Sequence, residues 1–572
     1  MCALAVAIGV LYPADDPSLA GGLRTLRAPW PDEIMLIVSG RSAAAIVQRR
    51  RRPQCSGCPT RRPCFRVSRG SANGTRRQRS RLGGKVPQIP DSRIRVCNTA
   101  DVRGDADYVL YWMIAFRRTG WNHSLQRAAD WAEKLAKPLV ILEALRVGYP
   151  WASDRLHHFV LNGMADNAWR LQSKRVHYHA YVEERAGDGK GLLSQVASRA
   201  CLVVTDDYPA FFLPRMVSAA ARQVPVRLEA VDSNGLLPLA ATDQVFKTAH
   251  SFRRFLQKNL PSQLSQFPLR DPLDGRRLED PPELRATVVE RWPSAAARLV
   301  ADQLSVTDLP IDHAVQVTDS VGGASEAATV LDRFLYERLP MYAEDRNHPD
   351  SEAASGLSPY LHFGHISSFE IFDALMTEEG WDQDRLAPDT SGKRSGWWGA
   401  SENAEAFLDQ LITWRELGFN MCAHRDDYDR YESLPDWAQA TLAEHAADDR
   451  RYLYPAAALE EARTHDEIWN AAQNQLRREG RLHNYLRMLW GKKILEWSPT
   501  PEDALQVMIE LNNKYALDGR DPNSYSGIFW CLGRYDRPWG PERPIFGKIR
   551  YMSSENTARK LRLAEYLETY ST

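Results

Sequence analysis

The chain has 572 residues, with 73 basic and 73 acidic side chains, 17 tryptophans and 8 cysteines. This length exceeds one ordinary hydrophobic core, so we expect two or more domains. Zero formal charge excludes a uniformly basic, histone-like binder but allows local basic patches. The scattered cysteines do not resemble a disulfide framework, and the run LAVAIGVLYP is too short to span a bilayer. We therefore expect a soluble, cytoplasmic protein.

Residues 1–92 differ in composition from the rest of the chain. From Arg49 to Arg81 there are twelve arginines and no acidic residue, interleaved with Ser, Gly and Pro. Such a composition predicts a disordered segment. It is either a nucleic-acid-binding arm or an upstream extension, and we favour the extension. The three cysteines of CSGCPTRRPC lack a nearby fourth ligand, so we predict no metal site there.

Residues 93–240 alternate apolar runs with amphipathic stretches. The runs that predict buried strands are YVLYWM, PLVILEAL, VHYHAYV, CLVVTDD and VPVRLEAV. The stretches that predict helices are 123–136, 154–172, 191–199 and 211–222. This alternation is typical of an α/β domain, in which a parallel sheet is covered by helices. No GxGxxG follows the first run, so the usual dinucleotide fingerprint is missing, although the switch point of such a sheet can still hold a ligand.

Residues 241–325 are polar and proline-rich in places and predict a connector between domains. Beyond it strand signals nearly vanish, and residues 326–572 predict an all-helical domain. Its expected helices are 326–337, 367–378, 402–422, 435–446, 466–478, 481–496, 502–513 and 555–570.

One stretch of this helical half, RMLWGKKILEW, sets Trp490 and Trp497 seven residues apart. Seven residues are almost two helical turns, so both indoles share one face about 10 Å apart along the axis. A buried core seam needs this spacing, and so does a chain of side chains that passes electrons. The stretch alone favours the core seam.

Three further motifs carry polar groups. SGLSPYLHFGHIS (355–367) places hydroxyls and small residues where a helix begins, which suits a phosphate or simply caps the helix. HNYLRM (483–488) and LDGRDPN (517–523) supply an Arg and an Asp for a buried ion pair, although the second motif is also a common turn. LITWREL (411–417), taken alone, is typical of an amphipathic surface helix.

SPYLHFG, WREL, HNYLRM, LDGRDPNSYSGIFW and GKIRYM, in this order behind an α/β half, resemble the photolyase and cryptochrome family. The resemblance is strongest to class II cyclobutane pyrimidine dimer photolyases and runs from about Ile94 to the C-terminus. It implies a Rossmann-like α/β antenna domain followed by an all-α FAD-binding domain. It also implies light-driven repair of cyclobutane dimers in UV-damaged DNA, by electron transfer from excited reduced FAD to a flipped-out dimer.

The resemblance carries the FAD site over to specific residues. Those implied around the phosphates and ribityl chain are Tyr342, Ser355, Leu357, Ser358 and Tyr360. Those implied beside the flavin are Asn484, Arg487 paired with Asp518, Asp521 near the same rim, and Asn512, with Asn513 as its alternative. Asn512 would face the central reactive nitrogen of the flavin. A second, light-harvesting chromophore such as a deazaflavin is an option for the α/β half, which the sequence does not identify.

The resemblance also bears on the tryptophans. Class II members are thought to reduce their flavin through a tryptophan chain, which here implies Trp490 nearest the flavin, Trp469 next and Trp497 at the surface. The other classes use differently placed tryptophans. Ile528 stands where those classes, aligned on Trp530, would carry one of theirs. We therefore favour the electron-transfer interpretation over a plain core seam.

The DNA site is implied in the same way. Trp414 and Trp530 would pack against the dimer, with Gln410 where family members commonly carry an acid. Glutamine can hydrogen-bond the lesion but cannot supply a proton, which leaves the preference between the cyclobutane dimer and the (6-4) photoproduct open. The candidates for phosphate contacts and for filling the gap in the duplex are Arg537, Trp539, Lys548 and Arg550, which otherwise form a solvated basic loop.

Two other functions compete with repair. A cryptochrome-type flavin photoreceptor would share the fold and FAD, but many such receptors carry a long signalling tail, whereas this chain ends soon after GKIRYM. A non-catalytic nucleic-acid-binding protein would use the arginine-rich segment and bind damaged and undamaged DNA equally. The motif set favours the enzyme, which we expect to be a monomer with no metal ion.

Overall fold

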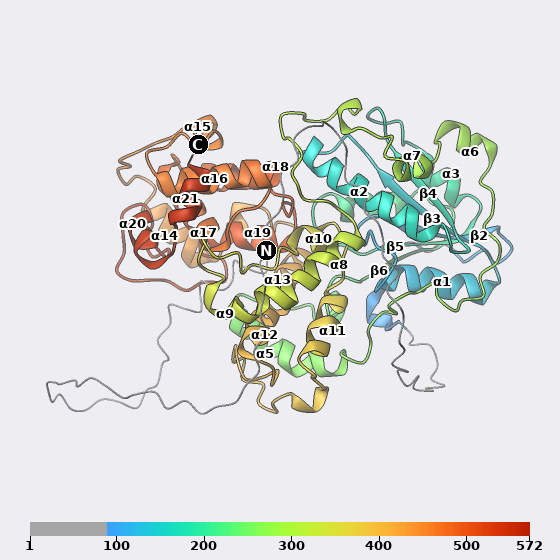
Figure 1. Ribbon diagram of the computed structural model, residues 1–572, viewed down its shortest axis with the longest axis horizontal. Helices are drawn as coiled ribbons and strands as arrows, with labels where there is room; N and C mark the ends of the chain where they lie inside the picture. Colours follow the sequence, from blue (N-terminus) through green and yellow to red (C-terminus); the bar gives the residue numbers. More distant parts are fainter. Residues whose placement is uncertain (1–88, 572) are drawn as a thin grey trace, which may run out of the picture. The chain divides into compact units, whose positions relative to one another are not determined.

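The computed structural model describes residues 89–571 of the chain (Figure 1). The arginine-rich stretch and its three cysteines lie outside these residues, so what was predicted for them stays a prediction. No helix within residues 89–571 is both long and apolar enough to cross a membrane.

The first half contains a six-stranded sheet in the order β1-β6-β5-β2-β3-β4. The strands are β1 (Ile94–Val96), β2 (Tyr108–Met113), β3 (Leu139–Leu145), β4 (His177–Val182), β5 (Ala200–Asp206) and β6 (Leu228–Val231). Strands β2 to β6 match the predicted apolar runs and pair in parallel. Strand β1 was not predicted, and it pairs antiparallel with β6 at the edge of the sheet.

Helices cover both faces of this sheet. They are α1 (His123–Leu135), α2 (Asp154–Leu171), α3 (Leu192–Ala197) and α4 (Leu213–Ala221), all in predicted places. Leu125 of α1 shares a buried cluster with Val109, whereas Val196 of α3 shares another with Leu110. Because successive strand residues point to opposite faces, α1 and α3 lie on opposite sides of the sheet.

The chain reverses its direction across the sheet between the neighbouring strands β2 and β5. Strands β3 and β4 follow on one side of β2, and β6 follows on the far side of β5. In doubly wound sheets the crevice beyond the carboxyl ends of these two strands is the usual place for a ligand. The fold therefore provides a second possible site besides the helical half.

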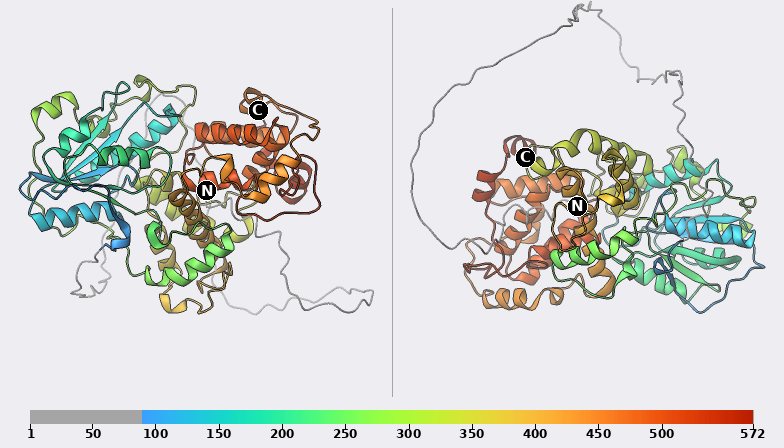
Figure 2. Two further views of the ribbon diagram at one scale, coloured as in Figure 1. Left: turned by 180° about the vertical axis from the view of Figure 1, so that it is seen from behind. Right: turned by 90° about the horizontal axis from the view of Figure 1, so that it is seen from below.

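The second half is helical, as predicted. Its main helices are α8 (Ala324–Arg333), α11 (Ser368–Glu378), α12 (Glu402–Leu408), α13 (Arg415–His424), α14 (Asp436–Glu444), α16 (Glu467–Glu479), α17 (Asn484–Trp497) and α18 (Pro501–Tyr515). The expected helix 555–570 is two helices, α20 (Ser554–Lys560) and α21 (Ala564–Tyr570). Helices α16, α17 and α18 pack against one another, and both views of Figure 2 show them grouped in orange and red.

Three of the helices that were not predicted bear on the candidate sites. Helix α5 (Ala249–Asn259) lies in the expected connector and packs against a π-helical turn, Asp409–Trp414, that joins α12 to α13. The others are α10 (Ser358–His362) and α19 (Pro522–Trp530). Helix α19 is buried along its whole length, so its sequence lacks the apolar periodicity that identifies an amphipathic helix.

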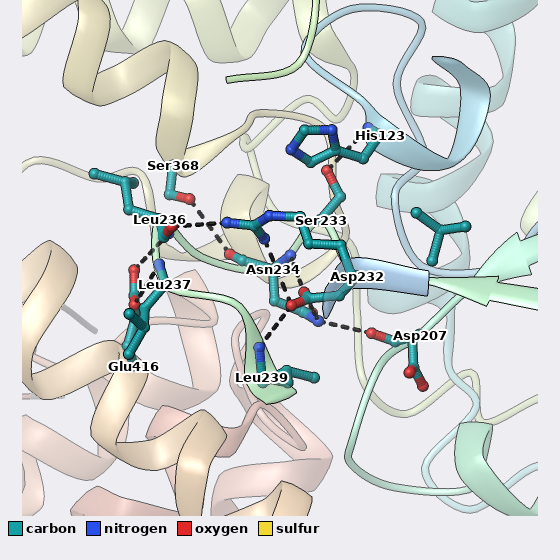
Figure 3. A network of polar contacts seen from close by, with 12 residues as sticks. His123, Asp207, Asp232, Ser233, Asn234, Leu236, Leu237, Leu239, Ser368 and Glu416 are labelled. Carbon is teal, nitrogen blue, oxygen red and sulfur yellow. Dashed lines mark hydrogen bonds and ion pairs between the residues drawn. The ribbon is translucent and has the colours of Figure 1, made fainter. Parts of the chain in front are cut away.

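The WREL motif joins the two halves, which corrects the expectation of an amphipathic surface helix. The Glu416 carboxylate accepts hydrogen bonds from the amides of Leu236 and Leu237 at 2.7 and 3.1 Å, in the loop after β6 (Figure 3). Arg415 donates to the carbonyl oxygen of Asn234 at 2.7 Å in the same loop. Burial raises the pKa of Glu416 to about 7, although the charge of Arg415 opposes the shift.

Candidate functional site

A polar cavity of the helical half has a volume of about 440 Å³. It is enclosed by α10 and the segment before it, the ends of α8 and α16, the start of α17 and the turn after α18. Residues predicted for the cofactor that line it are Tyr342, Ser355, Ser358, Tyr360, Asn484, Arg487 and Asp518. Motifs far apart in the sequence therefore meet around one space.

The predicted ion pair is present in the wall of this cavity. Arg487 Nη2 lies 3.6 Å from Asp518 Oδ1, and both side chains are buried. Arg487 Nη1 also donates to Asn512 Oδ1 at 3.2 Å. Asn512 does not line the cavity itself, and its amide nitrogen donates to Ser524 Oγ at 2.7 Å. Asn512 is thus held behind Arg487.

Two other predicted cofactor residues lie away from the cavity. Leu357 is buried, and only its amide contributes, as a donor to Ser355 Oγ at 3.3 Å. Asp521 caps the start of α19 and accepts a hydrogen bond from the Tyr208 hydroxyl at 2.9 Å. The cavity wall is therefore made by Ser355 and Asp518 rather than by these two neighbours.

Asn484 gives the clearest sign that the cavity binds a polar ligand. Its side chain is 5% exposed, and neither its oxygen nor its nitrogen has a hydrogen-bond partner among the described residues. Buried amides are almost always satisfied, so an unpaired amide at a cavity wall indicates a missing ligand or water. Arg338 and Arg481, which sequence analysis did not select, line the same wall, where both pair with Glu352. Cations, hydroxyls and a free amide fit a dinucleotide such as FAD.

The three tryptophans predicted to pass electrons are close together, but the predicted position of Trp497 at the surface is wrong. The indole nitrogen of Trp469 donates to the Trp490 carbonyl oxygen at 3.0 Å, and the rings of Trp469 and Trp497 are 5.5 Å apart. Trp490 donates to Gln473 Oε1 at 2.9 Å. Trp497 is only 1% exposed, so it does not lie at the surface. The prediction failed because Tyr454 and His465 pack against its ring.

The aromatic chain continues beyond Trp497 to residues that sequence analysis missed. The Tyr454 ring stands edge-on to Trp497 at 5.4 Å, and Tyr454 is partly exposed. Its hydroxyl lies 2.7 Å from His465 Nδ1. No residue spacing in the sequence could have predicted the contact between Tyr454 and Trp497, because Tyr454 lies in a loop far from Trp497 in sequence.

The residues predicted to contact the lesion share one property. Gln410 Oε1, Trp414 Nε1 and Trp530 Nε1 are buried and have no partner among the described residues. Asp409, next to Gln410, does not replace the missing acid, because Arg253 binds both its oxygens at 2.8 and 3.1 Å.

Lys492, which was not predicted, lies beside the Trp530 ring at 5.0 Å. Its ammonium group donates to the Cys531 carbonyl oxygen at 2.7 Å. Burial lowers its pKa to about 8. Lys493, the other lysine of RMLWGKKILEW, is also buried, so the motif places both lysines out of solvent.

The basic loop after α19 is partly occupied by internal contacts. The Arg550 guanidinium stacks on the Trp539 ring at 4.2 Å and is buried, and the Arg537 guanidinium lies 5.0 Å from the same ring. Lys548 is exposed and pairs with Glu542 at 2.9 Å. Arg537 and Lys548 are therefore accessible to a phosphate, whereas Arg550 supports Trp539.

A second cavity, of about 380 Å³, lies at the carboxyl ends of β2 and β3. Its wall is mainly apolar and aromatic, with Trp112, Leu142 and Tyr181 from the sheet and Phe212 and Met216 from the α4 region. Tyr208, in the loop after β5, also lines it, so the cavity extends from the β3 side of β2 to the crevice between β2 and β5.

Comparison with known proteins finds relatives of this chain in sequence. No family model matches the chain. A deoxyribodipyrimidine photo-lyase of Methanothermobacter thermautotrophicus is 35% identical over 484 residues, which cover 84% of this chain and 98% of the relative. The photo-lyase of Arabidopsis thaliana is 32% identical over 473 residues, covering 80% and 88%. The chain belongs to the deoxyribodipyrimidine photo-lyase family.

The fold of this photo-lyase family member is also found in a solved structure. A bacterial class III photolyase from Agrobacterium tumefaciens superimposes with a TM-score of 0.57 over 81% of this chain and 86% of its own, at 15% identity. The α/β half followed by an all-helical half is thus the photolyase fold, as predicted.

Proposed function

We propose that this chain is a class II photolyase that repairs cyclobutane pyrimidine dimers in UV-damaged DNA with FAD and blue light. The observation that carries the proposal is the buried, unpaired amide of Asn484 beside the Arg487–Asp518 pair, in the wall of a cavity of about 440 Å³. The membership of the photo-lyase family supports the same chemistry. Ile528, where other classes would carry a tryptophan, supports class II.

FAD, when bound, supplies the light-driven electron that opens the cyclobutane ring. The chain binds and orients it: Arg338 and Ser355 suit its phosphates, and Asn484 offers both a donor and an acceptor to a heterocycle or ribose. Asn512, as the partner of Arg487, completes the polar wall from behind. No metal or protein nucleophile is required.

The aromatic chain has the role of an internal electron donor. Tyr454, Trp497, Trp469 and Trp490 form a continuous series from a partly exposed phenol to helix α17, which also carries Asn484 and Arg487. Indole and phenol rings are among the few side chains that can give up an electron to a photoexcited acceptor. We propose that these residues relay an electron inward to keep the enzyme active.

Gln410, Trp414 and Trp530 form the proposed lesion site. The two indoles offer flat apolar faces to a flipped-out dimer, and each has an unpaired N–H. The Gln410 oxygen can accept a hydrogen bond from a thymine imide. Arg537 and Lys548 would hold the DNA backbone, while Trp539, supported by Arg550, would fill the gap in the duplex.

The apolar cavity of the α/β half is the proposed place of a light-harvesting chromophore. Its aromatic lining and its place at the switch point suit a planar heterocycle of the deazaflavin type.

The test follows dimers in a defined oligonucleotide that is incubated with the purified, reduced protein under blue light or in darkness. Loss of the dimer only in the light is expected. A yellow, FAD-loaded protein that leaves the dimer intact in the light would refute dimer repair. Because Gln410 cannot supply a proton, the same assay with a (6-4) photoproduct separates the second candidate function from the first, and no repair of either lesion would favour a photoreceptor.

A further inference from the structure

The polar and the apolar cavity share a wall, which we call the dividing wall. It consists of α10 with Phe363 and of the turn from Asp518 to Asp521. In α10, Tyr360 lines the polar cavity and His362 the apolar one. In the turn, Asp518 lines the polar cavity and Arg520 the apolar one. A ligand in either cavity therefore touches the same two short segments.

The two segments of the dividing wall are bonded to each other at both cavities. On the polar side the Ser358 side chain hydrogen-bonds Asp518. On the apolar side His362 Nδ1 lies 3.4 Å from Asp521 Oδ2, which also accepts the Tyr208 hydroxyl. The two segments are thus joined on both sides of the wall.

Arg520 lies on the apolar side of the dividing wall, and its hydrogen bonding within the described residues is incomplete. It is 2% exposed, and its φ of 67° lies in the left-handed region that favours glycine. Its amide and its Nη1 donate to the side chain and the carbonyl oxygen of Asn513, at 2.9 and 3.0 Å. Its Nη2 has no partner among the described residues. A buried donor without a partner disfavours this conformation, so an acceptor at Nη2 would stabilise the turn.

The same turn is bonded to the polar site. Asn512 Nδ2 donates to Asn513 Oδ1 at 3.3 Å, and Asn512 Oδ1 accepts from Arg487 at 3.2 Å. Arg487 in turn pairs with Asp518, two residues before Arg520. A series of hydrogen bonds thus joins Arg520 to the charged groups of the polar cavity.

We propose that the two cavities bind their ligands cooperatively and that Arg520 is the residue that couples them. The apolar cavity takes a planar aromatic ligand with an anionic or carbonyl oxygen, which accepts a hydrogen bond from Nη2. That bond holds the turn in the form that binds FAD. Linkage requires that FAD tightens the binding of the second ligand by the same factor. The inference rests on the proposed function, because it takes FAD as the ligand of the polar cavity.

The test measures the equilibrium Kd of FAD for the full-length apoprotein, with and without a saturating 8-hydroxy-5-deazaflavin. We expect the deazaflavin to lower the Kd at least fivefold in the wild type and to leave it unchanged in Arg520→Met. Arg534→Met is a matched control, because Arg534 is equally buried but lines neither cavity. It should keep the full fivefold effect. A wild-type Kd that does not change with the deazaflavin would overturn the coupling.

A second measurement needs no ligand in the apolar cavity. Arg520→Met should raise the Kd of FAD severalfold on its own, since it removes the bond from Nη1 to Asn513, and Arg520→Lys guards against misfolding by keeping the charge. An unchanged Kd in both variants would overturn the inference while leaving the proposed function intact. A wild-type protein with no affinity for FAD would refute the proposed function, and this inference with it.

Discussion

The indole N–H of Trp469 donates to the backbone carbonyl of Trp490 across two packed helices at 3.0 Å. This bond fixes one ring of the aromatic chain against the helix that carries Arg487. The ring of Trp469 in turn meets Trp497 at 5.5 Å. Trp469 is therefore the member of the proposed electron-transfer chain that contacts both of the others.

Replacing Trp469 with Phe should slow the photoreduction of bound FAD at least tenfold, because phenylalanine is much harder to oxidise than indole. Reduction is followed by the loss of the yellow absorption under blue light with an external reductant. Trp381→Phe is the matched control, since its indole also donates to a backbone carbonyl, that of Trp398 at 2.6 Å, outside the chain. Equal photoreduction rates in the two variants would show that electrons do not pass through Trp469.

Replacing Tyr454 with Phe should lower the yield of stable photoreduction severalfold while leaving its first step intact. The Tyr454 phenol can release its proton to His465 as it is oxidised, and phenylalanine cannot. Transient absorption should then show a tryptophan radical that decays as the electron returns to it from the reduced flavin. If the yield of long-lived reduced flavin equals that of the wild type, Tyr454 is not the surface end of the aromatic chain.

Replacing Gln410 with Leu should weaken binding of a dimer-containing duplex about tenfold, which is the worth of one buried hydrogen bond. The affinity for the undamaged duplex should not change, because Gln410 is buried and lies outside the basic loop. Fluorescence anisotropy with both duplexes measures the two constants. Equal weakening on damaged and undamaged DNA would contradict a role in lesion recognition.

Replacing Glu416 with Gln should remove a pH-dependent loss of stability. The pKa of Glu416 is raised from 4.5 to about 7, so the folded state holds its proton more tightly than the unfolded state. The wild type therefore loses stability as the pH rises from 4.5 to 7, by about 3 kcal/mol from this group. Denaturant unfolding at pH 5 and pH 8 measures the difference. Parallel pH curves for the two proteins would show that Glu416 does not titrate in this range.

The sequence predicted the sheet well because its strands are long, buried apolar runs between amphipathic helices. It also identified the ion pair of Arg487 and Asp518, since each residue stands in a motif of distinct composition. Helix α19 escaped because it is buried on every side and shows no period. The burial of Trp497 escaped because its cover comes from Tyr454 in a distant loop.

Parts of the candidate site that are built from several segments could not be predicted. The dividing wall brings α10 and the turn after α18 together, and nothing in either segment shows that each faces two cavities. The buried role of Glu416 depends on a loop about 180 positions earlier in the chain. Spacing within one element carries no information on such partners.

The π-helical turn Asp409–Trp414 sets a limit on chain length. It holds one residue more than an α-helical path between the same ends, and those ends are anchored by Arg253 on Asp409 and by the bonds of Glu416. Losing one residue here would restore a regular α-helix between the same ends and change the directions of the side chains within the turn. Gln410 and Trp414 could then not both keep their present directions. In this stretch the number of residues is under as strong a constraint as their identity.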